Sequence, residues 1–316
     1  MKILITGAAG MVARDLLAEL ADSGHAITAT DIRRPDALPD GVDYAPMDVT
    51  GDDPDTVIGE ARPEVVIHLA SIVTPPKGST RELEYAVDVT GTRNVLEACQ
   101  RHGVRRIVVT SSGAAYGYHP ENIRPLTEAD PIRGNPEFAY SDHKRQVEEM
   151  LAGARESHPE LEQVVLRVGT VLGAGTENQI TALFHKKRLL AIRGSDSAFV
   201  LIWTRDLARI LARAATAGPA GIYNVAGDGA LTVEQLAARM GKPVLRLPAA
   251  VLRAALAIAR PLGLTRYGPE QVRFLQYRPV LDNSALKTRF DYTPELSSAE
   301  VFDLWWQDAC KREDAA

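Results

Sequence analysis

Short apolar runs alternate with helical patterns through the first half of the sequence, and this alternation constrains the fold more than any other feature. Strands are predicted at Lys2–Thr6, Ala26–Asp31, Val65–Leu69, Arg106–Ser111 and Gln163–Val168. Helices are predicted between them at Met11–Asp22, Arg81–His102 and Tyr140–Ser157. Runs such as VVIHLA and QVVLRVG are apolar almost throughout, which is typical of strands buried on both faces of a parallel sheet. The pattern predicts an α/β fold with a doubly wound parallel sheet.

After about Gly169 the pattern becomes mixed. Short strands are predicted at Val200–Trp203 and Ile222–Val225. Helices are predicted around Arg205–Ala217, Val233–Met240, Ala249–Ala259, Pro269–Tyr277 and Ser298–Lys311. We therefore expect a smaller mixed α/β part after the sheet, with some segments, such as 200–225, returning to the sheet.

Composition excludes several classes of protein. The formal net charge of the 316 residues is −5, so no basic field favours nucleic acid. No apolar stretch of the length of a membrane span is present, and the first residues enter a strand without a signal-peptide pattern. Cys99 and Cys310 are too few for a disulfide framework and lie beside no histidine cluster. We expect a cytoplasmic protein without a structural metal.

The segment Thr6–Ala13, TGAAGMVA, follows the first predicted strand and opens the first helix. Gly7 can adopt a backbone angle that is closed to other residues, and Gly10 lets the chain approach a pyrophosphate. Ala13 is small enough for close packing of helix on sheet. A glycine loop alone is a weak signal, but a strand before it and a helix after it are what a dinucleotide-binding motif of the Rossmann type requires.

The second predicted strand ends in Asp31. An acid at this place accepts hydrogen bonds from the ribose hydroxyls of an NAD-type cofactor and repels a 2′-phosphate. Arg33 and Arg34 follow and would suit NADP, so NADP stays as the alternative to NAD; a capping role for Asp31 is also possible. Asp48 lies where a loop should pass the adenine. His68 is interpreted as a core or rim histidine.

Three residues suit hydride transfer coupled to proton transfer at a carbinol or carbonyl. Ser112 emerges at the carboxyl end of the fourth predicted strand, where ligands bind in open α/β sheets. Tyr140 and Lys144 are four residues apart on a predicted helix, so their side chains lie on one face. A cation beside a tyrosine stabilises the phenolate and lowers its pKa from near ~10. Ser112 would orient the substrate oxygen.

At this point the sequence resembles the extended short-chain dehydrogenases/reductases, the NAD-dependent epimerase/dehydratase family. The matching segments, in the order of the family, are TGAAGMVA, Asp31, MDVT, HLAS, VTGTRNVLEA, SSGAAYG, YSDHK and LRVGTVLGAG. The resemblance implies Ser112, Tyr140 and Lys144 as the catalytic residues. It implies cofactor contacts from Gly7, Ala9, Gly10, Met11, Val12, Asp31, Asp48, Val49, Leu69, Ala70, Ser71, Tyr140, Lys144, Val168 and Thr170. It also implies a homodimer with a small-molecule substrate.

The sequence departs from the family at several positions. Asp88 stands where the family usually carries Asn. Nucleotide-sugar enzymes usually carry an arginine near Ser197–Val200, where this chain has no cation. Arg278 is either a second phosphate-contacting arginine or a surface residue at a helix end. Gly113 and Ala114 lie where a dehydratase would carry an acid beside the serine, which disfavours dehydratase chemistry.

Two enzymatic functions and one binding function are consistent with these residues. The first is an NAD-dependent oxidoreductase that interconverts a secondary alcohol and a ketone, and the second is a nucleotide-sugar 4-epimerase with tightly bound NAD. The third, a non-catalytic dinucleotide sensor, has little use for the Ser–Tyr–Lys set. We expect residues 1–175 to form the NAD(P)-binding domain and residues 176–316 a smaller substrate-binding region. The loop 117–138 is where we expect substrate contacts.

Overall fold

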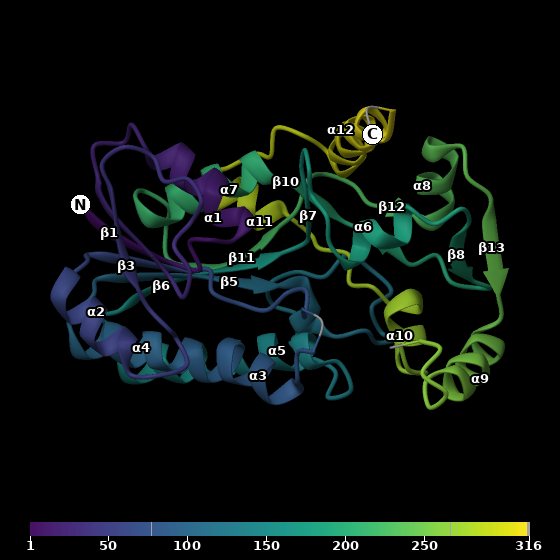
Figure 1. The fold of residues 1–316 in the computed structure, drawn as a ribbon, viewed down its shortest axis with the longest axis horizontal. Helices are drawn as coiled ribbons and strands as arrows, with labels where there is room; N and C mark the ends of the chain where they lie inside the picture. Colours follow the sequence, from purple (N-terminus) through teal and green to yellow (C-terminus); the bar gives the residue numbers. More distant parts are fainter. Residues whose placement is uncertain (77, 266, 315–316) are drawn as a thin grey trace.

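The computed structural model describes residues 1–76, 78–265 and 267–314. Its central sheet has seven strands in the order β11-β6-β5-β4-β1-β2-β3, and every pair is parallel (Figure 1). The strands are β1 (Lys2–Thr6), β2 (Ala26–Asp31), β3 (Val42–Pro46), β4 (Val65–His68), β5 (Arg106–Ser112), β6 (Glu162–Val168) and β11 (Gly221–Val225). The predicted α/β class with a doubly wound parallel sheet is confirmed.

Helices cover both faces of the sheet. One face carries α1 (Met11–Leu20), α7 (Thr204–Ala215) and α11 (Ser284–Thr288), and the other carries α2 (Asp53–Ala61), α4 (Gly91–Arg101) and α5 (Ala139–Ser157) (Figure 1). Because successive strand residues point to opposite faces, Ile3 and Ile5 of β1 enter the first core while Leu4 enters the second. Burial on both faces explains why these strands read as continuous apolar runs.

The helix predicted over Arg81–His102 is wrong as a single α-helix. It divides into α3 (Arg81–Tyr85), a π-helical turn η1 (Ala86–Thr90) and α4. The turn brings the chain very near the loop after β3, since a Cβ on Gly91 would lie only 2.6 Å from Cγ2 of Val49. Such π-helical insertions are rare and often occur at functional sites.

β3 and α2 are not among the predicted elements. β3 is the edge strand of the sheet and none of its residues is fully buried, so it carries no apolar run that would indicate a strand. In α2 only Pro54 and Ile58 are buried, which is too little for a helical period to stand out. β3 forms because it pairs with β2 at the edge of the sheet, and α2 forms because it packs on one face of the sheet. Both depend on contacts with residues that are distant in the sequence.

The C-terminal part forms a second, smaller body beside the sheet (Figure 1). It contains three two-stranded sheets: β7 (Thr170–Leu172) with β10 (Leu201–Trp203), β9 (Ala198–Phe199) with β12 (Leu231–Thr232), and β8 (Leu189–Ile192) with β13 (Val244–Leu247). Its helices are α6 (Gln179–Phe184), α8 (Val233–Met240), α9 (Ala249–Ala259), α10 (Gln271–Gln276) and α12 (Ser298–Asp314). Phe184, Phe302 and Trp305 lie at the centre of its core. Among the described residues, no helix has the length and apolar character needed to cross a membrane.

Candidate active site

The glycine loop lies at the carboxyl edge of the sheet, between β1 and α1. Gly7 has a φ of +68°, and a Cβ there would lie 2.6 Å from the backbone nitrogen of Ala70. Any side chain at position 7 would therefore collide with the end of β4 as well as strain the backbone. The Gly10 N–H donates to the Gly7 carbonyl oxygen at 3.0 Å, which closes the tight turn. This geometry leaves the start of α1 open to a phosphate group.

Asp31 ends β2 directly beside this loop. Its carboxylate accepts hydrogen bonds from the backbone N–H groups of Ala9, at 3.0 Å, and Arg33, at 3.1 Å. The guanidinium of Arg34 stacks on the Tyr44 ring, 5.3 Å from its centroid. The acid therefore faces the glycine loop while the neighbouring cation is held on the edge strand β3, an arrangement that fits ribose hydroxyls better than a 2′-phosphate.

Asp48 follows β3 and its carboxylate is used locally. Oδ1 accepts from the Thr50 backbone N–H at 2.8 Å and from the Thr50 hydroxyl at 2.7 Å. Val49 is buried and packs in the core beneath α4, so only its backbone would be available to a cofactor. The adenine-contacting role of Asp48 stays a prediction, with a turn-capping role now visible beside it.

His68 belongs to a hydrogen-bond network in the core, in agreement with its interpretation as a core histidine. Thr6 Oγ1 accepts from the backbone N–H groups of Leu69 and Ala70, so its own hydrogen points to His68 Nδ1, 2.8 Å away. His68 Nε2 lies 3.0 Å from Thr92 Oγ1, which itself donates to the Asp88 carbonyl. Burial, with a smaller contribution from the Lys144 charge, lowers the pKa of His68 to about 3. The ring is neutral and structural.

Ser112, Tyr140 and Lys144 come together beyond the carboxyl end of β5. The Lys144 ammonium lies 5.5 Å from the centroid of the Tyr140 ring and donates to the Thr110 carbonyl at 2.9 Å. Burial raises the pKa of Tyr140, and a hydrogen bond with Ser112 lowers it. Ser112 Oγ is 3.5 Å from the carbonyl oxygen of Val168, so the end of β6 borders the same place. The three residues chosen from the sequence thus form one site.

A buried ion pair that the sequence does not reveal fixes α5 on the sheet. Glu148 of α5 makes a bidentate pair with Arg167 of β6, with Nη2 to Oε2 at 2.7 Å. Ser111 Oγ donates to the same carboxylate at 2.5 Å. Arg167 also contacts the Tyr116 hydroxyl at 2.8 Å. Because Glu148 lies one turn beyond Lys144, this pair sets the position of the catalytic face of the helix.

Arg278 is a buried cation that lies against the rings of Phe199 and Phe274, and this burial excludes the alternative of a surface residue. It is 6% exposed, lies 3.9 Å from the centroid of the Phe199 ring, and donates from Nη2 to the Ser197 carbonyl. Its Nε and Nη1 atoms are buried and have no hydrogen-bond partner in the described part of the chain. Burial lowers the pKa of Arg278 to about 9, while Tyr118 raises it. Two unused donors on a buried cation fit an anionic ligand group.

Tyr118 connects this cation to the catalytic tyrosine. Its ring packs edge-on against Phe138, from the loop before α5, and against Phe274 of α10. Burial raises the pKa of Tyr118 to about 12, and the nearby Arg278 lowers it. Tyr118 is also close enough to Tyr140 to raise the pKa of that phenol. The loop 117–138 therefore contributes to the wall between Arg278 and Tyr140; its aromatic residues carry no motif that would reveal this role.

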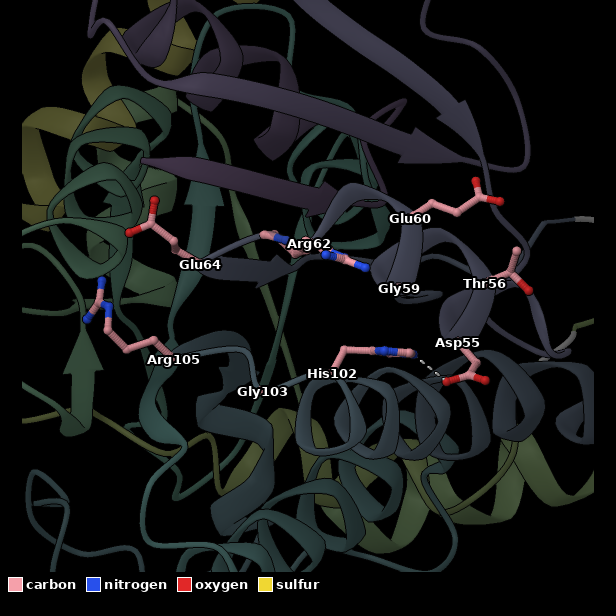
Figure 2. A pocket seen from close by; sticks show the side chains of 10 residues that line it. Asp55, Thr56, Gly59, Glu60, Arg62, Glu64, His102, Gly103 and Arg105 are labelled. Atoms are coloured by element: carbon pink, nitrogen blue, oxygen red, sulfur yellow. Dashed lines mark hydrogen bonds and ion pairs between the residues drawn. The ribbon is translucent and has the colours of Figure 1, made fainter.

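A second hollow lies at the opposite edge of the sheet, between the ends of α2 and α4 (Figure 2). His102 donates from Nε2 to Asp55 Oδ1, 2.8 Å away, and its ring fills the space over Gly59. Figure 2 shows Glu64 and Arg105 on its rim, at the amino ends of β4 and β5. Ligands of open α/β sheets bind at the carboxyl edge of the sheet. This hollow lies at the opposite edge, between the ends of α2 and α4, and is therefore separate from the candidate site.

The fold and the glycine loop together define a dinucleotide-dependent enzyme of the Rossmann type, with Ser112, Tyr140 and Lys144 gathered beyond the end of β5. The sequence model of the NAD dependent epimerase/dehydratase family matches residues 3–226, which is most of the chain. The chain belongs to this family, and the resemblance noted from the sequence is confirmed.

Individual relatives share about a third or less of their residues with this chain. A UDP-glucose 4-epimerase of Azospirillum brasilense is 31% identical over 215 residues, 62% of this chain and 60% of that protein. A decarboxylating sterol-4-alpha-carboxylate 3-dehydrogenase of Saccharomyces cerevisiae is 28% identical over 200 residues, 59% and 56% of the two chains. The structure of a Thermotoga maritima UDP-glucose 4-epimerase with UDP-glucose superposes with a TM-score of 0.77 at 19% identity, covering 99% of this chain and 100% of that one. The last likeness concerns the fold.

Proposed function

We propose that this enzyme interconverts a secondary alcohol and a ketone by hydride transfer to and from NAD. The observation that carries the proposal is the convergence of Ser112, Tyr140 and Lys144 at the carboxyl edge, next to the glycine loop. NAD supplies the hydride acceptor when bound. Gly7 and Gly10 would admit its pyrophosphate, and Asp31 would hold a ribose.

The side chains divide the proton chemistry among them. Ser112 donates a hydrogen bond to the substrate oxygen and orients the carbinol. Tyr140 takes the hydroxyl proton during oxidation and returns it during reduction. The Lys144 ammonium stabilises the Tyr140 phenolate, which burial otherwise disfavours, and it also reaches the ribose. The rigid seat of α5 on the Glu148–Arg167 pair keeps these groups in register.

The preference for NAD is tested by changing Asp31. We expect Asp31→Ala to weaken binding of NADH much more than binding of NADPH, because only NADH has a free 2′-hydroxyl on its adenosine ribose, and the 2′-phosphate of NADPH is repelled by the carboxylate. Cofactor affinities are measured by the quenching of protein fluorescence. Arg33→Ala is the matched control, which removes a neighbouring charge and should leave NADH binding unchanged. Equal losses for both cofactors in Asp31→Ala would exclude the ribose assignment.

A nucleotide-sugar 4-epimerase is the second candidate, and Arg278 is the observation that favours it. Two of its donors have no hydrogen-bond partner among the described residues and would suit the diphosphate of a nucleotide. The relatives from Azospirillum brasilense and Thermotoga maritima are named as UDP-glucose 4-epimerases. In an epimerase, hydride leaves and returns within one cycle, so external NAD is not consumed.

One experiment separates the two candidates. The purified protein is incubated with external NAD and a panel of UDP-sugars, uronates, hydroxysteroids and aryl alcohols, and absorbance of NADH is followed. Accumulation of NADH identifies a dehydrogenase. Conversion of a UDP-sugar to its 4-epimer, detected by chromatography without net NADH, identifies an epimerase. If neither occurs with any member of the panel and NAD does not bind, the proposed function is wrong.

We also infer that the enzyme acts as a homodimer in the cytoplasm. Leu83 and Tyr85 of the short helix α3 are exposed apolar residues, and α3 lies beside the long helix α5 on the same face of the sheet. Pairing of these helices across two copies would cover both side chains. Light scattering after size-exclusion chromatography tests this inference, and a Leu83→Arg variant should be monomeric.

A further inference from the structure

The outer side of α9 exposes an apolar surface. The helix lies at the far end of the smaller body, and none of its residues is fully buried (Figure 1). Val251, Ala255 and Ile258 recur at intervals of four and three residues, so they lie on one face of the helix. Val251 is 54% exposed and Ile258 is 65% exposed, and Leu262 and Leu264, in the turn that follows, are 65% and 76% exposed. These five residues are called the α9 face below.

Packing within the protein does not account for the composition of this helix. Arg253 is the only polar residue among the eleven residues of α9. Leu252 and Leu256 are half-buried on another side of the helix, and α9 packs against α10. Arg253 Nη2 donates to Gln276 Oε1 of α10 at 3.1 Å. A helix that meets water normally carries polar residues on that side, whereas a helix that is apolar all round is buried in protein or in lipid.

The sequence around α9 is basic, although the formal net charge of the protein is −5. The stretch from Gln235 to Pro269 contains no Asp or Glu, and its cations are Arg239, Lys242, Arg246, Arg253, Arg260 and Arg266. Some of them form ion pairs with acids outside the stretch: Arg239 with Asp303, Arg246 with Glu234, and Arg260 with Glu270. These pairs are partly exposed, and ion pairs of that kind are weak and screened by salt.

Two cations close to the start and the middle of α9 are not neutralised by such pairs. Arg193 is exposed after β8, and its backbone N–H donates to the carbonyl of Leu247, just before α9, at 2.9 Å. Arg253 is bonded to an uncharged amide. The exposed basic run 186–188 precedes β8, which pairs with β13. The smaller body therefore combines the α9 face with positive charge.

This combination fits a lipid surface that carries negative charge. Helices that lie in a membrane interface bury one apolar face at the level of the headgroups, and basic residues around that face attract anionic lipids. A second copy of this chain fits less well. A two-fold interface over α9 would use the same surface of both copies, so the cations Arg193 and Arg253 of each copy would meet like charges.

We propose that α9 attaches this protein to the surface of a bilayer that contains anionic lipids. The α9 face would lie among the headgroups and the upper parts of the acyl chains, with Arg193 and Arg253 beside lipid phosphates. The attachment is peripheral, because α9 has eleven residues and a spanning helix needs about twenty. It is independent of the proposed reaction.

The test is sedimentation of the intact protein with vesicles. One set of vesicles contains phosphatidylglycerol and phosphatidylcholine, and the other contains phosphatidylcholine alone. We expect the protein to sediment with the anionic vesicles and to stay largely in solution with the others. Raising the salt from about 0.1 M to about 0.5 M should weaken this binding, since salt screens the charges. A protein that does not sediment with the anionic vesicles at low salt overturns the proposal.

The apolar contribution is tested by a double variant, Val251→Ser with Ile258→Ser. Both side chains are exposed, so the fold should be kept, and thermal unfolding checks this. We expect the affinity for anionic vesicles to fall by at least about tenfold. The matched control is Val73→Ser with Ile32→Ser, which removes a valine and an isoleucine of similar exposure, 58% and 68%, from the sheet body. Equal losses in the two double variants would show that the α9 face is not the contact, and the proposal would be wrong.

The basic contribution is tested at Arg193 and Arg253. Arg193→Gln and Arg253→Gln should each reduce the affinity for anionic vesicles by about fivefold and should leave the weak binding to phosphatidylcholine unchanged. Arg93→Gln removes an exposed cation of α4 in the sheet body and is the control, which should bind as the unaltered protein does. A loss no greater than that of the control would refute the role given to the two arginines.

Light scattering in solution separates a lipid surface from a second copy. An unchanged molar mass in Val251→Ser with Ile258→Ser, together with loss of vesicle binding, supports the proposal. A fall in the molar mass of this variant, without vesicle binding by the unaltered protein, would assign the α9 face to contact between copies and overturn it. Neither measurement needs NAD or a substrate, so failure of the proposed reaction would be seen separately, as an absence of NAD binding or of hydride transfer.

Discussion

Tyr140 and Lys144 are both removed from water, and burial opposes the charged form of each side chain. It raises the pKa of the phenol and lowers the pKa of the ammonium. In the proposed mechanism the two charged forms would stabilise each other, since the ammonium lies 5.5 Å from the centroid of the Tyr140 ring and Ser112 is hydrogen-bonded to the phenol. Proton transfer at this site is therefore a property of the group of side chains.

Loss of the phenol should abolish turnover while leaving the cofactor site intact. We expect Tyr140→Phe to reduce kcat by at least about a hundredfold, the usual contribution of a general acid–base, because phenylalanine cannot exchange a proton with the substrate oxygen. Binding of NADH, followed by fluorescence, should stay close to that of the unaltered protein. Near-normal turnover in this variant would refute the acid–base assignment.

His68 makes stability depend on pH. Its pKa is about 3 in the folded protein against 6.5 in the unfolded chain, so between these values the unfolded chain binds one more proton. Stability is complete above pH 6.5 and falls as the pH decreases below it. We expect this residue to cost about 2 kcal/mol between pH 6.5 and 5. Urea unfolding at both pH values measures the loss, and His68→Gln should show a smaller one.

At the scale of elements, the π-helical turn η1 does what a regular helix would not. It places Asp88 inside the protein and brings Gly91 against the loop after β3. If residue 91 carried a Cβ, the start of α4 would have to move away from Val49, and the Asp88 carboxylate would move with it. The close packing of Gly91 on Val49 thus helps to fix where the buried Asp88 carboxylate lies.

The close approach at Gly91 predicts opposite effects for two glycine substitutions. Gly91→Ala should destabilise the protein by about 1–3 kcal/mol, because its Cβ would meet the Val49 side chain. Gly153→Ala in α5, where nothing lies within 4 Å of the new Cβ, should stabilise by about 0.5–1 kcal/mol. Denaturant unfolding measures both. Val49→Ala combined with Gly91→Ala should recover most of the loss; no recovery would mean that another contact is responsible.

Much of this arrangement is encoded locally and was predictable. The glycine loop, Asp31 and the strands β1, β2, β4, β5 and β6 follow from residue types and periods of burial. Ser112, Tyr140 and Lys144 follow from their places at a strand end and on one helix face. β3, the π-helical turn and the pairs of Asp88 with His143 and Glu148 with Arg167 were not predictable. Each depends on residues that are distant in sequence and meet only when the sheet is assembled, so no local pattern records it.

For the whole molecule, the two bodies have different tasks. The sheet carries the proposed cofactor site and the catalytic residues, and the smaller body contributes Arg278 and Phe274 to the wall of the same site. Arg278 is buried with two unused donors, which stability alone would not favour. If Arg278 binds an anionic substrate group as proposed, the cost of burying it is a cost of function.

Substitution of Arg278 should affect binding of a diphosphate without lowering the stability of the protein. Saturation with NAD at a hundred times its Kd should raise the free energy of unfolding by about 2.7 kcal/mol in both the unaltered protein and Arg278→Leu. UDP should stabilise the unaltered protein only, if the site binds a diphosphate. Arg278→Leu without ligand should be as stable as the unaltered protein or more so. Thermal and urea unfolding measure these effects, and stabilisation of Arg278→Leu by UDP would place the diphosphate elsewhere.

The loop that leads to Tyr140 is closed by residues from almost the other end of the chain. Leu126 donates its N–H to the Val280 carbonyl at 2.7 Å, and its own carbonyl accepts from Asp282 at 2.8 Å. β11 likewise must lie beside β6 before the sheet is complete. A chain still on the ribosome will therefore carry Ser112, Tyr140 and Lys144 long before it carries a working site. Activity of the proposed site therefore has to await synthesis of the segment around residues 280–282, well after Tyr140 and Lys144 have been made.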